Sequence, residues 1–518
     1  MSRVTASIAS SGEVPATAAL SPDDRRIAEW LFILTFCVCA YFYAGAGWNQ
    51  NSQFDLTRAI VEHHTFAVDA YASNTGDVSR HGGHVYANKA PGLAWLAALP
   101  YAVIHALETA GGVDVSDPRV VALNCFLCTA TVVAPLSAIV PALLYGYARR
   151  RREAALWAAL VALAVALATE QLPYSTLLMV HAPSGALMLL ALRSRRSGAG
   201  GLAAGLAVLM NYLCAPAVVL FALLRPRREA LKFLAGAVPA GVALLVYQRI
   251  CFGSATSTIV TGTDPRFLSK GALFGVLGRP SLEALYGITI SPYRGLFYFA
   301  PVLIAAVAGL VFWWQRGEAR GELLAILAIT LFFFAFNVTF NGWEGGFAIG
   351  ARYLVPLIPL WGLALLRARP RSLVVALAVL SFAINFTATA VDPQPSGTIP
   401  RPLTQYLVPL LLTGQFSPDV PITRPWSAET FTGHTSVNRL AHDEAVVFTR
   451  HAPGSAVSEW SSFNLGEPFF GAGALRSLIP IVLLLVAGVA AILWKARRLP
   501  AGADAPVEIS ATSGSGSC

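Results

Sequence analysis

Long apolar runs separated by short polar segments recur along the whole chain. Residues 31–46, 154–168, 323–338 and 477–494 are examples, and overall 55% of the residues are hydrophobic and only 13% are charged. Runs of this length and composition are typical of helices that cross a lipid bilayer. The pattern therefore predicts an all-α polytopic membrane protein.

Lysine and arginine residues gather in six clusters next to the ends of apolar runs. The clusters are 149–152, 193–196, 225–232, 316–320, 367–371 and 495–498. Such clusters mark the cytoplasmic ends of membrane helices. All six basic clusters lie on the cytoplasmic side of the membrane only under two conditions. Residues 91–108 must lie on the outer surface, and 200–224 must be a hairpin of two short helices turning near Asn211 and Tyr212. We therefore expect about twelve transmembrane helices, two of them short, with juxtamembrane helices in the first outer loop and both termini cytoplasmic.

The remaining polar segments divide the chain. We expect disordered cytoplasmic tails at 1–24 and 499–518. A transmembrane domain, including an outer loop at 48–119, is expected at 25–390. It is followed by an outer loop or small subdomain at 391–476 and by the last span at 477–498. The net charge of +9 is explained by the basic clusters, so no nucleic-acid partner is expected. The seven cysteines lie in apolar segments, at a span end or at the C-terminus, which predicts neither a disulfide framework nor a zinc site.

The predicted topology places polar chemistry on the extracytoplasmic face. The cytoplasmic loops are too short to hold a nucleotide-binding domain, whereas 48–119, 252–295 and 391–476 are long. Because nucleotide-activated substrates are scarce on that face, a membrane-borne substrate is expected.

Asp55 is the first candidate for chemistry, in the helix-like stretch "QFDLTRAIVE" of the first outer loop. A partly desolvated carboxylate at a membrane surface makes a suitable general base. The alternative is an acid near a helix start that complements the helix dipole. Asp77 follows in turn-rich surroundings and is a supporting candidate.

Four histidines in the same loop raise the question of a metal ion. The pair His81 and His84 in "HGGH" is separated by two glycines, so these side chains are not presented on one helix face as in zinc helices. His63 and His64 are adjacent. Ordinary interfacial histidines explain the pattern, and no metal is predicted, although the sequence does not decide whether a divalent ion is required.

Lys89, in "ANKAPGLAWLAALP", stands directly before the predicted surface helix. A cation there can bind a lipid phosphate, and the alternative is a flanking lysine that snorkels to the interface. Trp95 and Tyr101 are expected to anchor the helix at headgroup depth.

Two arginines and a histidine lie at the outer mouths of other spans. They are Arg294 in "SPYRGLFYFAP", Arg352 in "NGWEGGFAIGARYLVP", and His181 in "YSTLLMVHAPSG". An unpaired charge inside a span costs about 2.5–3.5 kcal/mol. We therefore expect Arg352 to pair with Glu344, with a bound phosphate or with both. His181 is either a supporting polar group of a site or a satisfied structural histidine.

With these residues assembled, the chain resembles GT-C glycosyltransferases, and is similar to those of family 39, which include protein O-mannosyltransferases and the lipid A aminoarabinose transferase. The resemblance covers the order of spans along the whole chain. "QFD" with Asp55 resembles the family's acid after the first span, and "NKAPG" with Lys89 resembles its Lys-Pro motif, with Ala90 between the two residues here. Arg294 resembles a phosphate-contacting arginine.

The resemblance implies a membrane glycosyltransferase that uses a polyprenyl-phosphate-linked hexose or pentose. Asp55 would act as the base in an inverting displacement, and Lys89, Arg294 and Arg352 would stabilise the phosphate. No cofactor is implied, and the partners would be membrane lipids, the lipid-linked donor and an unidentified acceptor. The expected location is the bacterial inner membrane, with a periplasmic active site and a monomeric protein. The alternatives are a secondary transporter, a flippase or a glycan ligase.

Overall fold

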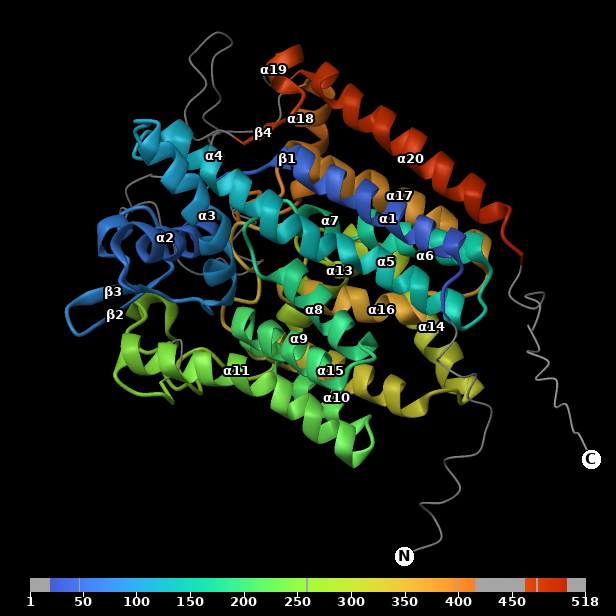
Figure 1. The fold of residues 1–518 in the computed structure, drawn as a ribbon, viewed down its shortest axis with the longest axis horizontal. Helices are drawn as coiled ribbons and strands as arrows, with labels where there is room; N and C mark the ends of the chain where they lie inside the picture. Colours follow the sequence, from blue (N-terminus) through green and yellow to red (C-terminus); the bar gives the residue numbers. More distant parts are fainter. Residues whose placement is uncertain are drawn as a thin grey trace, which may run out of the picture.

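The computed structural model describes residues 19–45, 47–257, 260–397, 399–414, 462–471 and 474–500. This part of the chain is a bundle of helices with two small two-stranded antiparallel sheets (Figure 1). Six of its helical segments are long and apolar enough to cross a membrane, namely Gly92–Ala110, Pro118–Arg150, Arg227–Phe252, Arg320–Thr339, Arg371–Val391 and Leu475–Arg497. The prediction of an all-α polytopic membrane protein is confirmed, and the count of twelve spans stays a prediction.

The elements follow one another in chain order. The first helices are α1 Pro22–Tyr41, α2 Trp48–His63, α3 Gly92–Ala110, α4 Pro118–Cys128, α5 Ala134–Arg150, α6 Ala155–Leu167, α7 Gln171–Tyr174, α8 His181–Arg193, α9 Ser197–Met210 and α10 Ala215–Leu223. The later helices are α11 Arg227–Phe252, α12 Leu282–Thr289, α13 Leu296–Phe299, α14 Val302–Arg316, α15 Arg320–Thr339, α16 Ile358–Leu365, α17 Arg371–Val391, α18 Val408–Thr413, α19 Glu467–Phe470 and α20 Ile479–Arg497. Strand β1 Phe42–Tyr43 pairs with β4 Phe463–Asn464, and β2 Val78–His81 pairs with β3 His84–Ala87.

The basic clusters of the sequence meet at one end of the bundle, which we call the terminal end. Ion pairs join them there: Lys495–Asp23 at 2.6 Å, Arg149–Asp24 at 2.8 Å, Arg193–Glu322 at 3.0 Å, Arg371–Glu153 at 3.4 Å and Arg151–Glu318 at 3.7 Å. The start of α1 and the end of α20 are therefore neighbours. The charge pattern predicted that the basic clusters lie at the same end of the bundle, and the structure agrees. The assignment of this end to the cytoplasm stays a prediction.

The opposite end, which we call the loop end, carries α2, α3 and the β2–β3 hairpin (Figure 1). The last turns of α11 also reach it, since Tyr247, Cys251 and Phe252 pack in one apolar cluster with side chains of α2 and the hairpin. Long outer loops were expected on the face opposite the basic clusters, and this arrangement agrees with that expectation.

Residues 197–223 form a hairpin, as expected, with a break at Asn211. Helices α9 and α11 run parallel, because Gly201 packs on Phe233 and the Tyr212 hydroxyl accepts a hydrogen bond from Gln248 at 3.2 Å. The chain must therefore return through α10. The 14 residues of α9 span only about 21 Å, too little for a bilayer core of about 30 Å.

Helix α3 stays at the loop end although its composition would suit a membrane span. Its Gly92 lies against the backbone of Leu209, beside the hairpin turn, and Glu108 near its end accepts a hydrogen bond from Asn124 of α4 at 3.0 Å. One expectation was wrong. Trp95 and Tyr101 do not face lipid headgroups but pack inward, against Tyr247 of α11 and against α2, because the apolar stripe exposed on α3 is instead Leu99, Val103 and Leu107.

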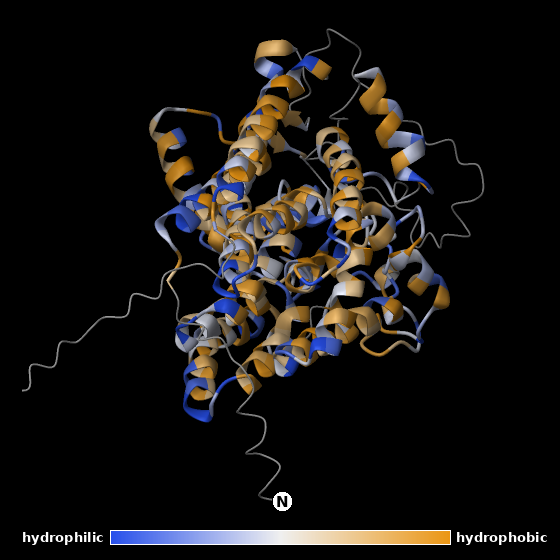
Figure 2. Cartoon of the chain, turned by 90° about the vertical axis from the view of Figure 1, so that its right-hand side faces the viewer, coloured by the Kyte–Doolittle hydropathy of each residue, from blue (hydrophilic) through white to orange (hydrophobic). Residues whose placement is uncertain are grey.

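Large apolar side chains are exposed along the outer faces of the long helices, especially α11 and α20. Figure 2 shows hydrophobic residues over most of the helices, with hydrophilic residues mainly at their ends and in the connections. An exposed apolar belt of this extent fits contact with lipid rather than with water.

The structure moves one segment boundary of the sequence analysis. Helix α1 begins at Pro22, with Ser21 as its N-cap, inside the stretch assigned to the N-terminal tail. Residues 1–18 and 501–518 of the expected tails lie outside the described residues, as do 415–461 of the segment 391–476. The described parts of that segment pack on the bundle through α18 and through the pairing of β4 with β1.

Candidate active site

Asp55 lies in the middle of α2 and is buried, with 1% of its surface exposed. Its Oδ1 accepts a hydrogen bond from Asn74 Nδ2 at 2.9 Å, and its Oδ2 has no hydrogen-bond partner in the described part of the chain. Burial raises the pKa of Asp55 to about 8, although the Asn74 hydrogen bond and the charge of Arg58 both act to lower it. A carboxyl of this kind binds a proton readily near neutral pH, which is the property of a general base.

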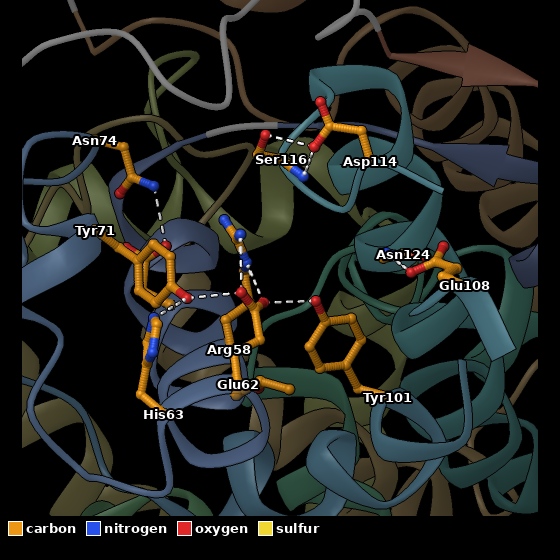
Figure 3. Close-up of polar contacts among 12 residues, drawn as sticks. Arg58, Glu62, His63, Tyr71, Asn74, Tyr101, Glu108, Asp114, Ser116 and Asn124 are labelled. Carbon is orange, nitrogen blue, oxygen red and sulfur yellow. Dashed lines mark hydrogen bonds and ion pairs between the residues drawn. The ribbon is translucent and has the colours of Figure 1, made fainter. Parts of the chain in front are cut away.

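About two turns along α2, a second carboxylate, Glu62, fixes the helix in place (Figure 3). Glu62 accepts hydrogen bonds from Arg58 Nε at 2.7 Å, from the Tyr101 hydroxyl of α3 at 2.7 Å and from the Tyr71 hydroxyl at 2.9 Å. These three donors hold the pKa of Glu62 below its ordinary value despite partial burial. The cluster clamps α2 between α3 and the loop that carries Asn74, and so positions Asp55.

The β2–β3 hairpin brings Asp77 and Lys89 together at its base. Val78 pairs with Ala87, so the residues flanking the two strands are neighbours. Lys89 Nζ lies 3.0 Å from Asp77 Oδ2, and the two side chains are 23% and 18% exposed. The Ser52 hydroxyl donates to the Asp77 carbonyl oxygen at 2.7 Å, which ties this ion pair to the same helix as Asp55.

Arg352, which lies much later in the sequence, is close enough to this ion pair to be affected by its charge. The charge of Asp77 acts on its guanidinium. Its Nη2 donates to the Tyr353 hydroxyl at 2.9 Å, and its side chain passes over Gly345, where a Cβ would come within 2.9 Å of Nε. The Nε has no hydrogen-bond partner among the described residues. The guanidinium therefore keeps donor capacity for a ligand, and its observed hydrogen bond is to Tyr353.

His181, the first residue of α8, lies close enough to Arg352 and Lys89 to feel both charges. Its ring packs edge-on against Tyr174 and Tyr353, with ring centroids 5.5 and 5.8 Å apart. Neither ring nitrogen has a hydrogen-bond partner in the described structure. His181 is therefore not a satisfied structural histidine.

Arg294 is completely buried and donates its hydrogen bonds to backbone carbonyl oxygens. Its Nε reaches the oxygen of Glu344 at 3.0 Å, its Nη2 that of Gly346 at 2.7 Å and its Nη1 that of Tyr293 at 3.4 Å. The backbone carbonyl oxygen of Glu344 therefore accepts a hydrogen bond from Arg294 and not from Arg352. These contacts make Arg294 the residue that fixes the 344–346 turn beneath Arg352.

The structure brings four predicted residues, Asp77, Lys89, His181 and Arg352, into one cluster, which we call the cation cluster. Asp55 is linked to it indirectly, through α2 and the loop from Asn74 to Asp77. Arg294 and Glu344 contribute to the turn at its border.

Two residues of this region were missed in the sequence. Asn74, the hydrogen-bond donor to Asp55, stands in the turn-rich "ASNTGD" without any feature that separates it from an ordinary turn residue. Glu170 is a buried carboxyl next to Gly350. An acid directly after the apolar run 154–168 was a signal that could have identified it.

Two histidines of the first loop lie close to polar side chains of the same loop. His84 Nδ1 lies 2.7 Å from Asp69 Oδ2 on the exposed hairpin, and His63 Nε2 lies 3.0 Å from the Tyr71 hydroxyl. Within the described ranges, no three His, Cys, Asp or Glu side chains gather in a way that could hold a metal ion.

Comparison with known proteins adds little. No protein-family model matches the chain, and no curated protein matches it. Among solved structures, the crystal structure of ArnT from Cupriavidus metallidurans in the apo state is similar, with 17% sequence identity, a TM-score of 0.41, and coverage of 75% of this chain and 70% of that one. A likeness this distant leaves the substrate and the chemistry to be argued from the residues of this chain.

Proposed function

We propose that this protein is a membrane glycosyltransferase that transfers a sugar from a polyprenyl-phosphate donor to an acceptor hydroxyl at the extracytoplasmic face. The observation that carries the proposal is the cation cluster at the loop end of a membrane bundle, joined through α2 to a buried carboxyl of raised pKa. The same proposal places the protein in the bacterial inner membrane, as a monomer with both termini in the cytoplasm.

Lys89 and Arg352 are suited to bind the phosphate of a lipid. Both side chains are only partly exposed, so their attraction for an anion is screened less than it would be on an open surface. Asp77 holds Lys89 in place, and a lipid phosphate would compete with Asp77 for the ammonium group. Arg294 serves by positioning the turn on which Arg352 rests.

Asp55 is the proposed base. The acceptor oxygen attacks the anomeric carbon, the bond from that carbon to the phosphate oxygen breaks, and the polyprenyl phosphate leaves with the electron pair. The acceptor proton passes to Asp55, and one displacement inverts the anomeric configuration. Lys89 and Arg352 stabilise the negative charge that develops on the leaving phosphate.

The test uses purified protein in nanodiscs with decaprenyl phosphate carrying radiolabelled mannose or glucose, and membrane extracts as acceptor. Wild-type protein should move label from the donor lipid to a second product, and Asp55→Asn should abolish this transfer. Lys89→Ala tests the phosphate contact in the same assay. Its matched control is Lys232→Ala, at an exposed lysine paired with Glu229 near the terminal end. In proteoliposomes, movement of lipid or sugar across the bilayer without a covalent product would contradict the proposal and favour a transporter or flippase.

A further inference from the structure

Glu170 is a completely buried carboxyl for which the proposed reaction has no use. It follows α6 and precedes α7, and both of its carboxyl oxygens lack a hydrogen-bond partner in the described structure. Gly350 lies directly against it, since a Cβ there would come within 2.9 Å of Glu170 Cγ and Oε1. Gly350 also has φ +61°, so both its conformation and its neighbour favour glycine.

Two further side chains in this region, Gln171 and His181, also have unpartnered polar atoms. Gln171 Nε2 donates weakly to the Ala182 carbonyl oxygen at 3.4 Å, while its Oε1 has no partner in the same described region. His181, one residue before Ala182, has two unpartnered ring nitrogens. Native proteins pair nearly all buried polar atoms, so three such side chains together point to a group that is bound there in the working protein.

His181 belongs to the cation cluster, and Tyr174 connects that cluster to Glu170. Tyr174 feels the charges of Arg352, Arg294 and Glu170 together, and its ring contacts His181. Gly350 is two residues from Arg352. Gly350 contacts Glu170, so the segment that carries Arg352 also contacts the unpartnered carboxyl.

The chemistry of these groups defines what they can bind. The Glu170 carboxyl and the Gln171 amide oxygen offer acceptors, the carboxyl adds a donor when it is protonated, and a neutral imidazole adds one donor and one acceptor. The complement is a small moiety with several hydroxyl donors. In a polyprenyl-phosphate sugar, the sugar ring is attached to the phosphate itself.

We propose that Glu170, Gln171 and His181 form the subsite that recognises the hydroxyl groups of the transferred sugar. This inference rests on the proposed function, and it assigns Glu170 a role in specificity rather than in proton transfer. A site that hydrogen-bonds a hydroxyl discriminates strongly, because its buried polar groups are left unpaired by a ligand lacking that hydroxyl.

The experiment measures binding of decaprenyl phosphate, and of decaprenyl phosphate carrying one mannose, one glucose or one arabinose, to the full-length protein in nanodiscs. Wild-type protein should bind at least one sugar lipid more tightly than bare decaprenyl phosphate. Glu170→Gln and Glu170→Ala should lose about tenfold or more of that preference and keep their affinity for decaprenyl phosphate. Glu318→Gln, at an exposed glutamate of the terminal end, is the matched control and should behave as wild type.

The binding experiment distinguishes failure of the proposed function from failure of the sugar subsite. If wild-type protein binds none of these lipids, the proposed function itself is wrong. If it binds them and Glu170→Gln keeps the full preference for a sugar lipid, the sugar subsite is wrong while the phosphate site stands. Without lipid, Glu170→Gln should unfold at the wild-type temperature or above it, because this isosteric substitution breaks no hydrogen bond within the described structure. A large decrease would show that Glu170 is structural and would overturn the inference.

Discussion

Replacing Asp55 by asparagine should change the stability of the protein in a pH-dependent way. Burial raises the pKa of Asp55 from 3.8 to about 8 in the folded protein. The folded state therefore holds the Asp55 proton more tightly than the unfolded state does. Ionising this group destabilises the fold, and the loss of stability grows as pH rises from about 4 and levels off above about 8. Asparagine has the shape of the carboxyl but never ionises, and its oxygen can still accept from Asn74.

The size of the effect follows from the shift. One pKa unit corresponds to about 1.4 kcal/mol, so between pH 5.5 and pH 8.5 the wild-type protein should lose about 3 kcal/mol more than Asp55→Asn, as an upper limit. The unpaired amide of the new asparagine adds a constant penalty, which cancels when one compares the two pH values.

The assay is thermal unfolding of both proteins in the same detergent across this pH range. The unfolding temperature of Asp55→Asn relative to wild type should rise by several degrees between pH 5.5 and pH 8.5. Asp69→Asn, at an exposed aspartate whose pKa is lowered by its bond to His84, should show no such rise. A difference for Asp55→Asn that stays constant over the range would refute the idea that this carboxyl is held in a desolvated site.

Four further predictions address the activity and the fold. Transfer by wild-type protein should rise with pH through about 8, and Asn74→Ala should move this rise to higher pH in a pH–rate profile, because the Asn74 hydrogen bond lowers the pKa of Asp55. Lys89→Ala should weaken binding of decaprenyl phosphate by about tenfold, as measured by lipid titration, since it removes a charge-assisted contact. Glu62→Ala should destabilise the protein by about 3–5 kcal/mol in denaturant unfolding, because it leaves Arg58 buried and unpaired. Gly350→Ala should cost about 1–2 kcal/mol from its left-handed backbone alone and should abolish sugar-lipid preference in the binding assay.

Much of the fold could be predicted because the bilayer simplifies the problem. Apolar runs indicate helices, and basic clusters indicate which helix ends lie together. The hairpin at Asn211 could be predicted from these clusters, while the position of α3 on the membrane surface stays a prediction. The inward packing of Trp95 could not be predicted in this way. An aromatic side chain suits both a headgroup layer and a protein interior, and the choice depends on Tyr247, which lies far along the chain.

The site could be predicted residue by residue but not as an arrangement. Charges at span ends identified Lys89 and Arg352, since such charges need partners. The sequence could not show that Arg294 donates to carbonyl oxygens of the 344–346 turn, because backbone partners leave no mark in the side-chain pattern. The position of Glu170 directly after an apolar run was a signal in the sequence, but its burial against Gly350 could be known only from the structure.

The central claim is that the loop end holds a transferase site for a phosphate-linked sugar. Its most direct test is product analysis by mass spectrometry after purified wild-type protein and Asp55→Asn are incubated with decaprenyl-phosphate sugar and membrane extract. The account predicts free decaprenyl phosphate and an acceptor increased by one sugar mass with wild-type protein, with the opposite anomeric configuration, and neither product with Asp55→Asn. Equal product with both proteins would contradict the role of Asp55, and the absence of any product with wild-type protein would contradict the claim itself.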